Sequence, residues 1–326
     1  MKKLVYFLLI FLVSCGNADN IADSSNESVE EGFLIYDILS PDDKYNSRTF
    51  SSVVKTNNEY IIFYSVRDVE TWEYSIYRNS SSDYMNFSNS NEIEVVPNKS
   101  DTYSFMHTYV PYVFYENDTY YMIFTAREYE NDTFEAVYIA TSSNSYDWEV
   151  NLNPILIPEF QWEGNEIENW GLIKIEDKYY MNFESAGPNR LQEERHVGNA
   201  YSEDLINWYK ISESPTIKNT VYCASFFSYN NEIYIVVPNV HQFKVYKFTD
   251  FEKLAEKNFI GFFRPYGTSE EFVVDTPEII TNDIKKEVST SDEFNFIFGS
   301  YRAGEWYTSI INFKNVEEFL SSLKKN

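Results

Sequence analysis

Apolar and polar residues alternate along this chain in short runs, and turn-forming residues interrupt the runs. The clearest runs follow turns rich in Asn, Asp, Glu or Ser and span residues 60–63, 121–124, 180–183, 234–237 and 296–298. A turn followed by aromatic and β-branched residues predicts the second strand of a β-hairpin. The runs recur about every sixty residues without a convincing amphipathic helix between them. This period predicts an all-β fold, a five-bladed β-propeller in which each blade is a four-stranded antiparallel sheet.

A second pattern ends the third predicted strand of the first three repeats. It reads Ser-Ser-Asp-Tyr-Met-Asn-Phe at 81–87, Ser-Ser-Asn-Ser-Tyr-Asp-Trp at 142–148 and Ser-Glu-Asp-Leu-Ile-Asn-Trp at 202–208, with a remnant at 249–251. Ser, Asp and Asn side chains stabilise turns through hydrogen bonds to nearby backbone groups. We therefore predict that this pattern is structural, with its final aromatic residue packed between adjacent blades.

The repeats set the expected boundaries of the folded domain, residues 33–326. The blades are predicted over residues 45–100, 101–160, 161–218, 219–265 and 266–313. The apolar stretch 33–39 is expected to add a strand to the last blade, which closes the ring and removes an exposed edge. Asn315, with Glu318 at the reciprocal capping-box position, predicts a helix over 315–324.

The first residues have the pattern of an export signal. Lys2 and Lys3 precede an apolar run over 4–13, and this run is shorter than the roughly 20 residues that span a bilayer. Residues 12–15, Leu-Val-Ser-Cys, resemble the bacterial lipobox. The resemblance implies removal of residues 1–14, lipidation of Cys15 and a flexible tether over 15–32. A lipid-anchored protein of the cell envelope is expected; the alternative is an ordinary secretory signal with a chance cysteine.

Composition narrows the classes of partner. The formal net charge is −25, and the chain contains 26 Phe, 28 Tyr and 6 Trp. A negative field of this size repels nucleic acid and anionic membranes, although it also serves plain solubility. Nucleic acid is therefore not an expected partner, the membrane is expected to be contacted only through the lipid, and the protein is expected to be a monomer. With Cys15 lipidated, Cys223 has no partner for an intramolecular disulfide.

The pattern at 202–208 resembles a sequence motif of the five-bladed glycosidases, glycoside hydrolase families 43 and 32, and the resemblance extends over about residues 45–312. The sialidase aspartate box fits less well because it contains a glycine and one more residue before its tryptophan. The resemblance implies a carbohydrate ligand and acid/base hydrolysis of a glycosidic bond in a poly- or oligosaccharide. A carbohydrate-binding propeller without catalysis is the alternative, and a scaffold for protein partners is a third reading.

Equivalent positions on the innermost strands of a propeller form a ring around its channel. Alignment of the repeats predicts that this ring contains Arg48, Tyr109, Glu168, Tyr222 and Asp275. The two carboxylates would supply the pair that glycosidases require. Arg48, Tyr109 and Tyr222 would bind sugar, and aromatic residues nearby in sequence would add stacking faces, namely Trp162, Trp170 and Tyr266.

The catalytic roles follow from the resemblance. Residues 168–173, Glu-Asn-Trp-Gly-Leu-Ile, resemble the family 32 motif Glu-Cys-Pro-Asp-Leu-Phe, which implies that Glu168 is the general acid. The aspartates that these families carry in their first and second blades have no equivalents here. Asp275, or Asp43 or Asp42 upstream of the first blade, is therefore the expected base.

Three arginines end the second strands of their blades, so they are expected to face the same mouth. Arg67, Arg127 and Arg302 would either bind the carboxylate or sulfate of an acidic sugar or pair with the neighbouring Asp68 and Glu128. His107 is expected beside them. The histidines lack metal-ligand spacing, and no phosphate-binding or calcium-binding loop is present. The sequence therefore predicts no metal and no cofactor.

Overall fold

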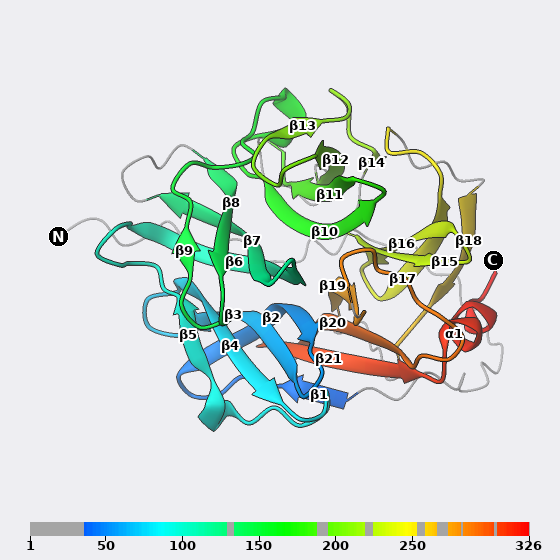
Figure 1. The fold of residues 1–326 in the computed structure, drawn as a ribbon, viewed down its shortest axis with the longest axis horizontal. Coiled ribbons are helices and arrows are strands. Elements are labelled where there is room, and N and C mark those ends of the chain that lie inside the picture. The colour runs from blue at the N-terminus through cyan, green and yellow to red at the C-terminus, as the bar shows by residue number, and fades with distance from the viewer. Residues whose placement is uncertain are drawn as a thin grey trace, which may run out of the picture. The chain divides into compact units, whose positions relative to one another are not determined.

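The computed structural model describes residues 36–128, 134–187, 195–218, 224–252, 258–265, 273–281, 283–302 and 305–325. These residues are mostly β-strand, and the strands form several antiparallel sheets (Figure 1). Within these ranges, no helix has the length and apolar character needed to cross a bilayer. Cys15 and the expected tether lie outside the described residues.

The first two predicted repeats each form four antiparallel strands paired in chain order. The first repeat contains β2 (Tyr45–Lys55), β3 (Tyr60–Asp68), β4 (Tyr74–Ser81) and β5 (Ile93–Val96). The second contains β6 (Phe105–Glu116), β7 (Thr119–Glu128), β8 (Glu135–Ser142) and β9 (Glu149–Val150). A short 3-10 helix, Asn89–Asn91, precedes β5. The expectation of four-stranded antiparallel units is confirmed for this half of the chain.

The next two repeats follow the same plan. The third contains β10 (Glu168–Ile175), β11 (Lys178–Ser185), β12 (His196–Ser202) and β13 (Trp208–Lys210), and β14 (Ile217–Lys218) also pairs with β12. A 3-10 helix, Gln161–Glu163, precedes β10. The fourth contains β15 (Ser225–Tyr229), β16 (Glu232–Asn239), β17 (Gln242–Phe248) and β18 (Phe259–Phe263).

The N- and C-terminal strands share one sheet. The last repeat supplies β19 (Val273–Ile279), β20 (Phe294–Arg302) and β21 (Glu305–Phe313), and β1 (Tyr36–Leu39) pairs antiparallel with β21, as the sequence predicted. One parallel pairing, Ser47 with Trp306, joins β21 to β2 and makes this sheet eight-stranded. The described strands therefore form a propeller-like fold of four hydrogen-bonded sheets, and the number of blades stays a prediction.

The repeated turn pattern is structural, as predicted. The Asp204 carboxylate accepts from the backbone N–H groups of Ile206 and Asn207 at 2.9 and 2.8 Å, and the indole of Trp208 donates to the carbonyl of Leu205 at 2.9 Å. The hydrogen bonds from Asn207 lower the pKa of Asp204 to about 2. In the second repeat, the ring of Trp148 packs edge-on against Phe63 of the first repeat, with centroids 5.7 Å apart. The closing aromatic residue thus joins neighbouring sheets.

A short helix covers one end of the aromatic core. Helix α1 (Val316–Ser322) begins where the side chain of Asn315 accepts from the N–H of Glu318 at 3.0 Å, and the Glu318 carboxylate accepts from Lys314 N–H rather than from the cap itself. Phe319 is buried and stacks on Phe294 at 4.7 Å. The helix therefore contributes apolar packing to the last two repeats.

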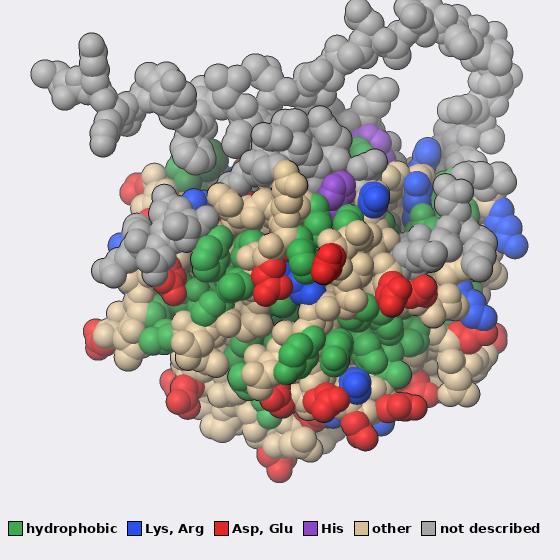
Figure 2. Space-filling model, turned by 90° about the horizontal axis from the view of Figure 1, so that it is seen from above, with side chains coloured by type: hydrophobic (Ala, Val, Ile, Leu, Met, Phe, Trp, Pro, Cys, Tyr) green, Lys and Arg blue, Asp and Glu red, His purple; other side chains and the backbone are tan. Residues whose placement is uncertain are grey.

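Acidic side chains are spread over the surface that Figure 2 shows, with basic and apolar side chains among them. This distribution agrees with the net charge of −25. A surface of this kind weakens long-range attraction to anionic polymers.

Candidate active site

Bulges interrupt the innermost strands at matching positions. The pairing register shifts after Thr49 in β2, after Tyr109 in β6, after Asn169 in β10 and after Asp275 in β19. The next residue has positive φ in three of these strands: Phe50 at 53°, Val110 at 53° and Thr276 at 43°. Bulges of this type turn side chains toward a new direction and often lie next to functional sites.

The bulged segments meet around one pocket. The residues that line it come from the inner strands of four repeats and from the segment before β15: Phe50, Ser51, Val110, Pro111, Tyr112, Gly171, Ala224, Thr276, Pro277 and Glu278. At Gly171 a Cβ atom would lie 2.5 Å from the carbonyl oxygen of Ala224, so only glycine allows these two strands to approach so closely. The innermost strands therefore surround a common channel, as their place in each repeat predicted.

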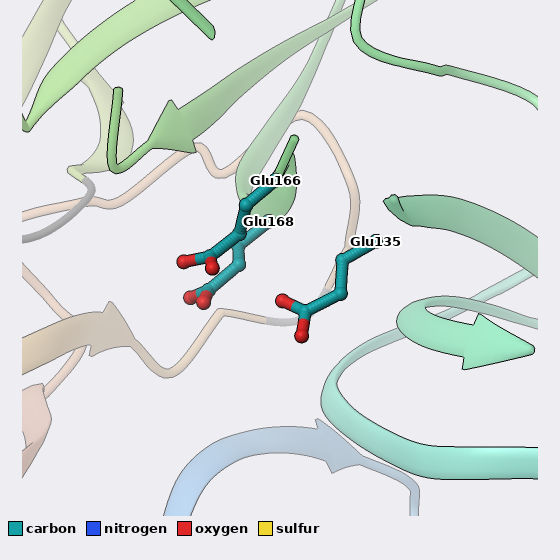
Figure 3. A group of neighbouring side chains, drawn as sticks. All are labelled: Glu135, Glu166 and Glu168. Carbon is teal, nitrogen blue, oxygen red and sulfur yellow. The ribbon is translucent and has the colours of Figure 1, made fainter. Parts of the chain in front are cut away.

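Three glutamates gather beside this channel. Glu168 begins β10, Glu166 lies two residues before it, and Glu135 begins β8; all three are buried. Their carboxylate oxygens lie within 4.8 Å of one another, and Figure 3 shows the three side chains directed toward a shared space. The backbone holds the two segments together, because Glu135 N–H donates to the Asn165 carbonyl at 2.8 Å. This cluster joins the second and third repeats.

Tyr109 connects the cluster to an aromatic wall. Its hydroxyl oxygen lies 2.7 Å from Glu135 Oε2 and 3.0 Å from Glu168 Oε1, and its single proton can be donated to one of these carboxyls at a time. Its ring stacks on Tyr74 at 5.6 Å and meets Phe50 edge-on at 6.2 Å. Burial, followed by the charges of Glu135 and Glu168, raises the pKa of Tyr109 well above its usual range. The phenol therefore keeps its proton and acts as a fixed hydrogen-bond donor.

The surroundings of Glu168 favour the protonated form of its carboxyl. Burial raises its pKa well above the usual range, and the charges of Glu166 and Glu184 add to this effect, while Arg195 opposes it. A carboxyl that stays neutral in a walled site can donate a proton to a leaving group. The direction of this pKa shift suits a general acid, and the role of Glu168 stays a prediction.

Glu184 and Arg195 also belong to the site, although the sequence did not indicate them. Glu184 lies opposite Glu168 in the pairing of β10 with β11, is fully buried and forms an ion pair with Arg195. An ionised carboxylate at this place explains why Glu184 raises the pKa of its neighbours. One feature of the sequence could have indicated Glu184. It is a charged residue directly after the run 180–183, at a position where a buried strand usually has another apolar residue.

Asp275 lies on β19 beside the same channel. It is fully buried, and neither carboxylate oxygen has a hydrogen bond of standard geometry to a described residue. Burial raises its pKa to about 8; the Thr276 hydroxyl opposes the rise and the charge of Glu184 adds to it. A Cβ atom at Gly299 would lie 2.9 Å from Asp275 Oδ1 and 2.6 Å from Thr49 Oγ1, so glycine is needed there. The Asp275 carboxyl is therefore mostly neutral at pH 7.

The carboxyls of Glu168 and Asp275 both affect the pKa of Tyr74. The charges of both carboxyls contribute to the raised pKa of Tyr74, after the larger effect of burial and the opposing effects of Arg67 and Ser47. Tyr74 in turn stacks on Tyr109. The two predicted catalytic carboxyls are therefore within electrostatic range of one phenol.

Arg48 does not line the mouth, and this prediction was wrong. Its guanidinium is completely buried and donates to Asp42 Oδ2 at 2.7 Å, Glu92 Oε1 at 3.0 Å and the Ser40 carbonyl at 2.8 Å. The bulges align Thr49, not Arg48, with Tyr109 and Asp275. The same comparison aligns Asn169, not Glu168, with these residues, so the ion pairs of Arg48, and not the register alone, separate it from the site. Arg48 is therefore a structural residue.

Asp43, the alternative catalytic base, has different surroundings from Asp275. Asp43 is exposed in the turn before β2 and is not among the main charges that act on Glu168 or Asp275. The neighbouring Asp42 is bound to Arg48 and accepts from Lys44 and Tyr45 N–H groups at 3.0 and 2.9 Å. The described structure thus brings Asp275, and not Asp43, to the buried site.

Arg67 and Arg127 make contacts that neither interpretation of the sequence predicted. Arg127 lies 3.5 Å from Glu135 Oε1 and belongs to the carboxylate cluster. Arg67 donates to Asn46 Oδ1 at 2.9 Å and lies over the rings of Trp72 and Tyr74. Among the described contacts, neither arginine pairs with the adjacent Asp68 or Glu128. Arg302 is in β20, and its side chain lies outside the described part of the structure.

His107 lies at the site, as expected. Its Nδ1 accepts from the N–H of Tyr74 at 3.4 Å, and its ring meets Tyr74 and Tyr109 edge-on. Trp162 is a packing residue, because it stacks on Phe183 and donates to the Glu213 carbonyl at 3.0 Å. Three predicted ligand groups lie outside what the structure describes: Tyr222, Tyr266 and the side chain of Trp170.

The glutamate cluster could offer oxygen ligands to a hard cation such as Ca²⁺ or Mg²⁺. Each of Glu135, Glu166 and Glu168 would supply one oxygen, fewer than the six to eight that Ca²⁺ takes. Two of these carboxylates already lie within hydrogen-bond distance of the Tyr109 hydroxyl, and Arg127 lies beside Glu135. The donor set therefore suits proton sharing better than metal binding.

No family model matches the chain, and a search of curated proteins finds no match either. Several solved structures share the fold. The catalytic domain of a family 62 α-L-arabinofuranosidase from Coprinopsis cinerea is 12% identical, with 86% of this chain and 97% of that chain covered and a TM-score of 0.63. A family 117 glycoside hydrolase from Zobellia galactanivorans is 12% identical, with coverage of 88% and 91% and a TM-score of 0.67.

A further neighbour belongs to family 130, described as mannoside phosphorylases that include glycoside hydrolases acting on β-1,2 mannosidic linkages in Candida mannan. It is 14% identical, with coverage of 91% and 96% and a TM-score of 0.57. Two family 62 neighbours were solved with cellotriose and with xylotriose. At these identities the likeness establishes the fold alone. The families named are 62, 117 and 130, and the narrower resemblance to families 43 and 32 stays a prediction.

Proposed function

We propose that this protein is a glycoside hydrolase-like lipoprotein that cleaves a glycosidic bond in a poly- or oligosaccharide by acid/base hydrolysis. The observation that carries the proposal is the buried carboxyl of Glu168, which lies 3.0 Å from the Tyr109 hydroxyl within a cluster of three glutamates and has a pKa raised by burial. The fold shared with glycoside hydrolases of families 62, 117 and 130 supports a carbohydrate ligand.

The finer architecture and the location are part of the proposal. We infer that the eight-stranded sheet contains two blades, one of them completed by β1, so that the fold has five blades of the kind found in families 43 and 32. The lipobox-like residues 12–15 support a lipid on Cys15 and anchoring in the cell envelope.

The proposed chemistry assigns a role to each carboxyl. Glu168 donates its proton to the leaving oxygen as the bond from that oxygen to the anomeric carbon breaks. Water attacks the anomeric carbon, and its proton passes to Asp275 once that group is ionised. Because the pKa of Asp275 is raised to about 8, activity should increase with pH toward 8 and decline where Glu168 loses its proton.

A second candidate is a carbohydrate-binding propeller without catalysis. The complete burial of Asp275 favours it, because a base with no exposed surface cannot receive a proton from water unless the site opens. Both candidates predict sugar binding, and only the first predicts cleavage.

The deciding experiment measures release of reducing sugar from a panel of poly- and oligosaccharides by the native protein and by Glu168→Gln. The matched control is Glu203→Gln, since Glu203 is an exposed glutamate paired with Lys178. Cleavage by the native protein and the control, lost in Glu168→Gln, supports a glycosidase with Glu168 as its acid. Binding without cleavage by all three proteins supports the second candidate, and no binding at all contradicts both.

A further inference from the structure

Trp72 stands out among the apolar side chains at the surface. It lies in the turn between β3 and β4 and is 59% exposed, although most tryptophans bury the larger part of their surface. Its φ of 63° is in the left-handed region, which bulky residues rarely adopt. Backbone strain of this kind persists where the surrounding structure enforces it, and it is concentrated at ligand-binding sites.

The turn holds Trp72 in a fixed position. Its N–H donates to the Asp68 carbonyl at 3.0 Å, and the Asp68 carboxylate accepts from the N–H groups of Glu70 and Thr71 at 2.8 and 2.9 Å. The indole ring of Trp72 is therefore held in place by a hydrogen-bonded turn. A ligand that stacks on it loses little free energy to ordering of the protein.

Arg67 covers the indole and connects it with the candidate active site. Its guanidinium carbon lies 4.9 Å from the ring centroid of Trp72 and 5.6 Å from that of Tyr74. Tyr74 stacks on Tyr109, and Tyr109 contacts Glu168. These contacts form a continuous series from the buried acid to an exposed aromatic surface.

Arg67 also has hydrogen-bonding capacity left over. Its Nε donates to the neutral Asn46 side chain, and no described carboxylate forms an ion pair with it. A guanidinium has five N–H donors in a fixed plane. A sugar at the edge of the Trp72 ring, beside the guanidinium, would have these donors next to its hydroxyl oxygens.

The charges of the turn limit the chemistry of that ligand. Asp68 and Glu70 belong to the turn, Glu73 follows it, and hydrogen bonds from Thr71 lower the pKa of Asp68 so that it stays ionised. Three acidic residues around one arginine disfavour an anionic sugar. A neutral sugar ring has an apolar C–H face for stacking and hydroxyls for hydrogen bonds.

We propose that Trp72 and Arg67 form a subsite for a neutral sugar unit of an oligosaccharide that extends from the Glu168 site to the surface. This assignment rests on the proposed carbohydrate function and adds to it a residue and a class of sugar. The subsite has one aromatic face, provided by Trp72, and one set of donors, provided by Arg67.

The test measures dissociation constants by titration calorimetry for neutral xylo-, cello- and manno-oligosaccharides and for oligogalacturonides. The proteins compared are the native chain, Trp72→Ala, Trp72→Phe and the control Tyr209→Ala. Tyr209 is 58% exposed on the outer strand β13, so the control removes an aromatic ring of similar exposure elsewhere. Circular dichroism checks that each variant is folded.

The expected result is that Trp72→Ala weakens binding of a neutral oligosaccharide about tenfold. Trp72→Phe should recover part of the loss, and Tyr209→Ala should match the native protein. Equal affinities of Trp72→Ala and Tyr209→Ala for a bound sugar would overturn the subsite and leave the carbohydrate function standing. Binding of oligogalacturonides alone would overturn the neutral-sugar assignment. If the native protein binds no sugar in the panel, the subsite and the proposed function both fail.

Discussion

The phenol oxygen of Tyr109 lies 3.0 Å from Oε1 of Glu168, and the same oxygen lies 2.7 Å from a carboxylate oxygen of Glu135. A tyrosine hydroxyl has one proton and can donate to one of these carboxyls at a time. The other contact is a hydrogen bond only if a carboxyl donates to the phenol. Because the pKa of Glu168 is raised, Glu168 is the group that holds this second proton.

We expect Tyr109→Phe to lower the free energy of unfolding by about 1–3 kcal/mol, because two buried carboxyls lose a hydrogen-bond partner. Urea denaturation measures the change. Tyr121→Phe is the control, since Tyr121 stacks on Phe114 at 5.2 Å on another part of the sheet. Equal losses in the two variants would contradict a special role for the Tyr109 hydroxyl.

Glu184→Gln should shift the pH dependence of the site downward. It removes a negative charge that raises the pKa of both Glu168 and Asp275 and leaves the opposing Arg195 in place. Glu168 works as an acid only while protonated, so the alkaline limb of a pH–activity profile should move to lower pH. Carbon-detected NMR titration of Glu168 gives the same information without activity. An unchanged titration would show that Glu184 does not act on Glu168.

Asp275→Asn should change how stability depends on pH. A carboxyl whose pKa is about 3.9 in the unfolded chain and about 8 when folded binds more protons in the folded state between these values. Stability therefore falls as pH rises through this window, with a limiting slope of roughly 1.4 kcal/mol per pH unit. The variant loses this contribution.

Urea denaturation at several values from pH 5 to pH 8 tests the Asp275 prediction. The variant should gain stability relative to the native protein as the pH increases. The exposed Asp43→Asn should run parallel to the native protein at every pH. A constant difference between Asp275→Asn and the native protein would argue against a raised pKa in Asp275.

The variant Arg48→Met tests whether Arg48 stabilises the fold or binds the ligand. The substitution removes a buried guanidinium from Asp42 and Glu92, and breaking a buried ion pair costs roughly 3–5 kcal/mol. We expect a lower urea midpoint and, in the folded fraction, native sugar affinity. Arg264→Met is the control, because the exposed Arg264 contacts the neutral Gln242. Loss of sugar affinity without loss of stability would return Arg48 to the binding site.

Some features of the site could be predicted from the sequence, and others could not. Tyr109 and Asp275 lie at matching positions of their strands, as the repeat alignment expected, because each directly precedes the bulge of its strand. Glu135 and Glu184 were not expected, because the alignment considered only the innermost strands; Glu184 lies opposite Glu168 on β11, and Glu135 reaches the site from β8 of the preceding repeat. The Trp72 surface was also missed, since exposure is a property of the folded chain.

The sequence by itself determined the strands and their order. Alternation of apolar residues and the Ser-Asp turn chemistry are local, so the hairpins and the N-cap at Asn315 could be predicted from short segments, whereas the pairing of β1 with β21 was predicted from the repeats and the need to close the ring. Only the tertiary structure decided which polar side chains meet. Bulges occur at matching positions in β2, β6 and β10, yet Arg48 is buried in an ion pair while Tyr109 lies beside Glu168, so the packing of each side chain decides the difference.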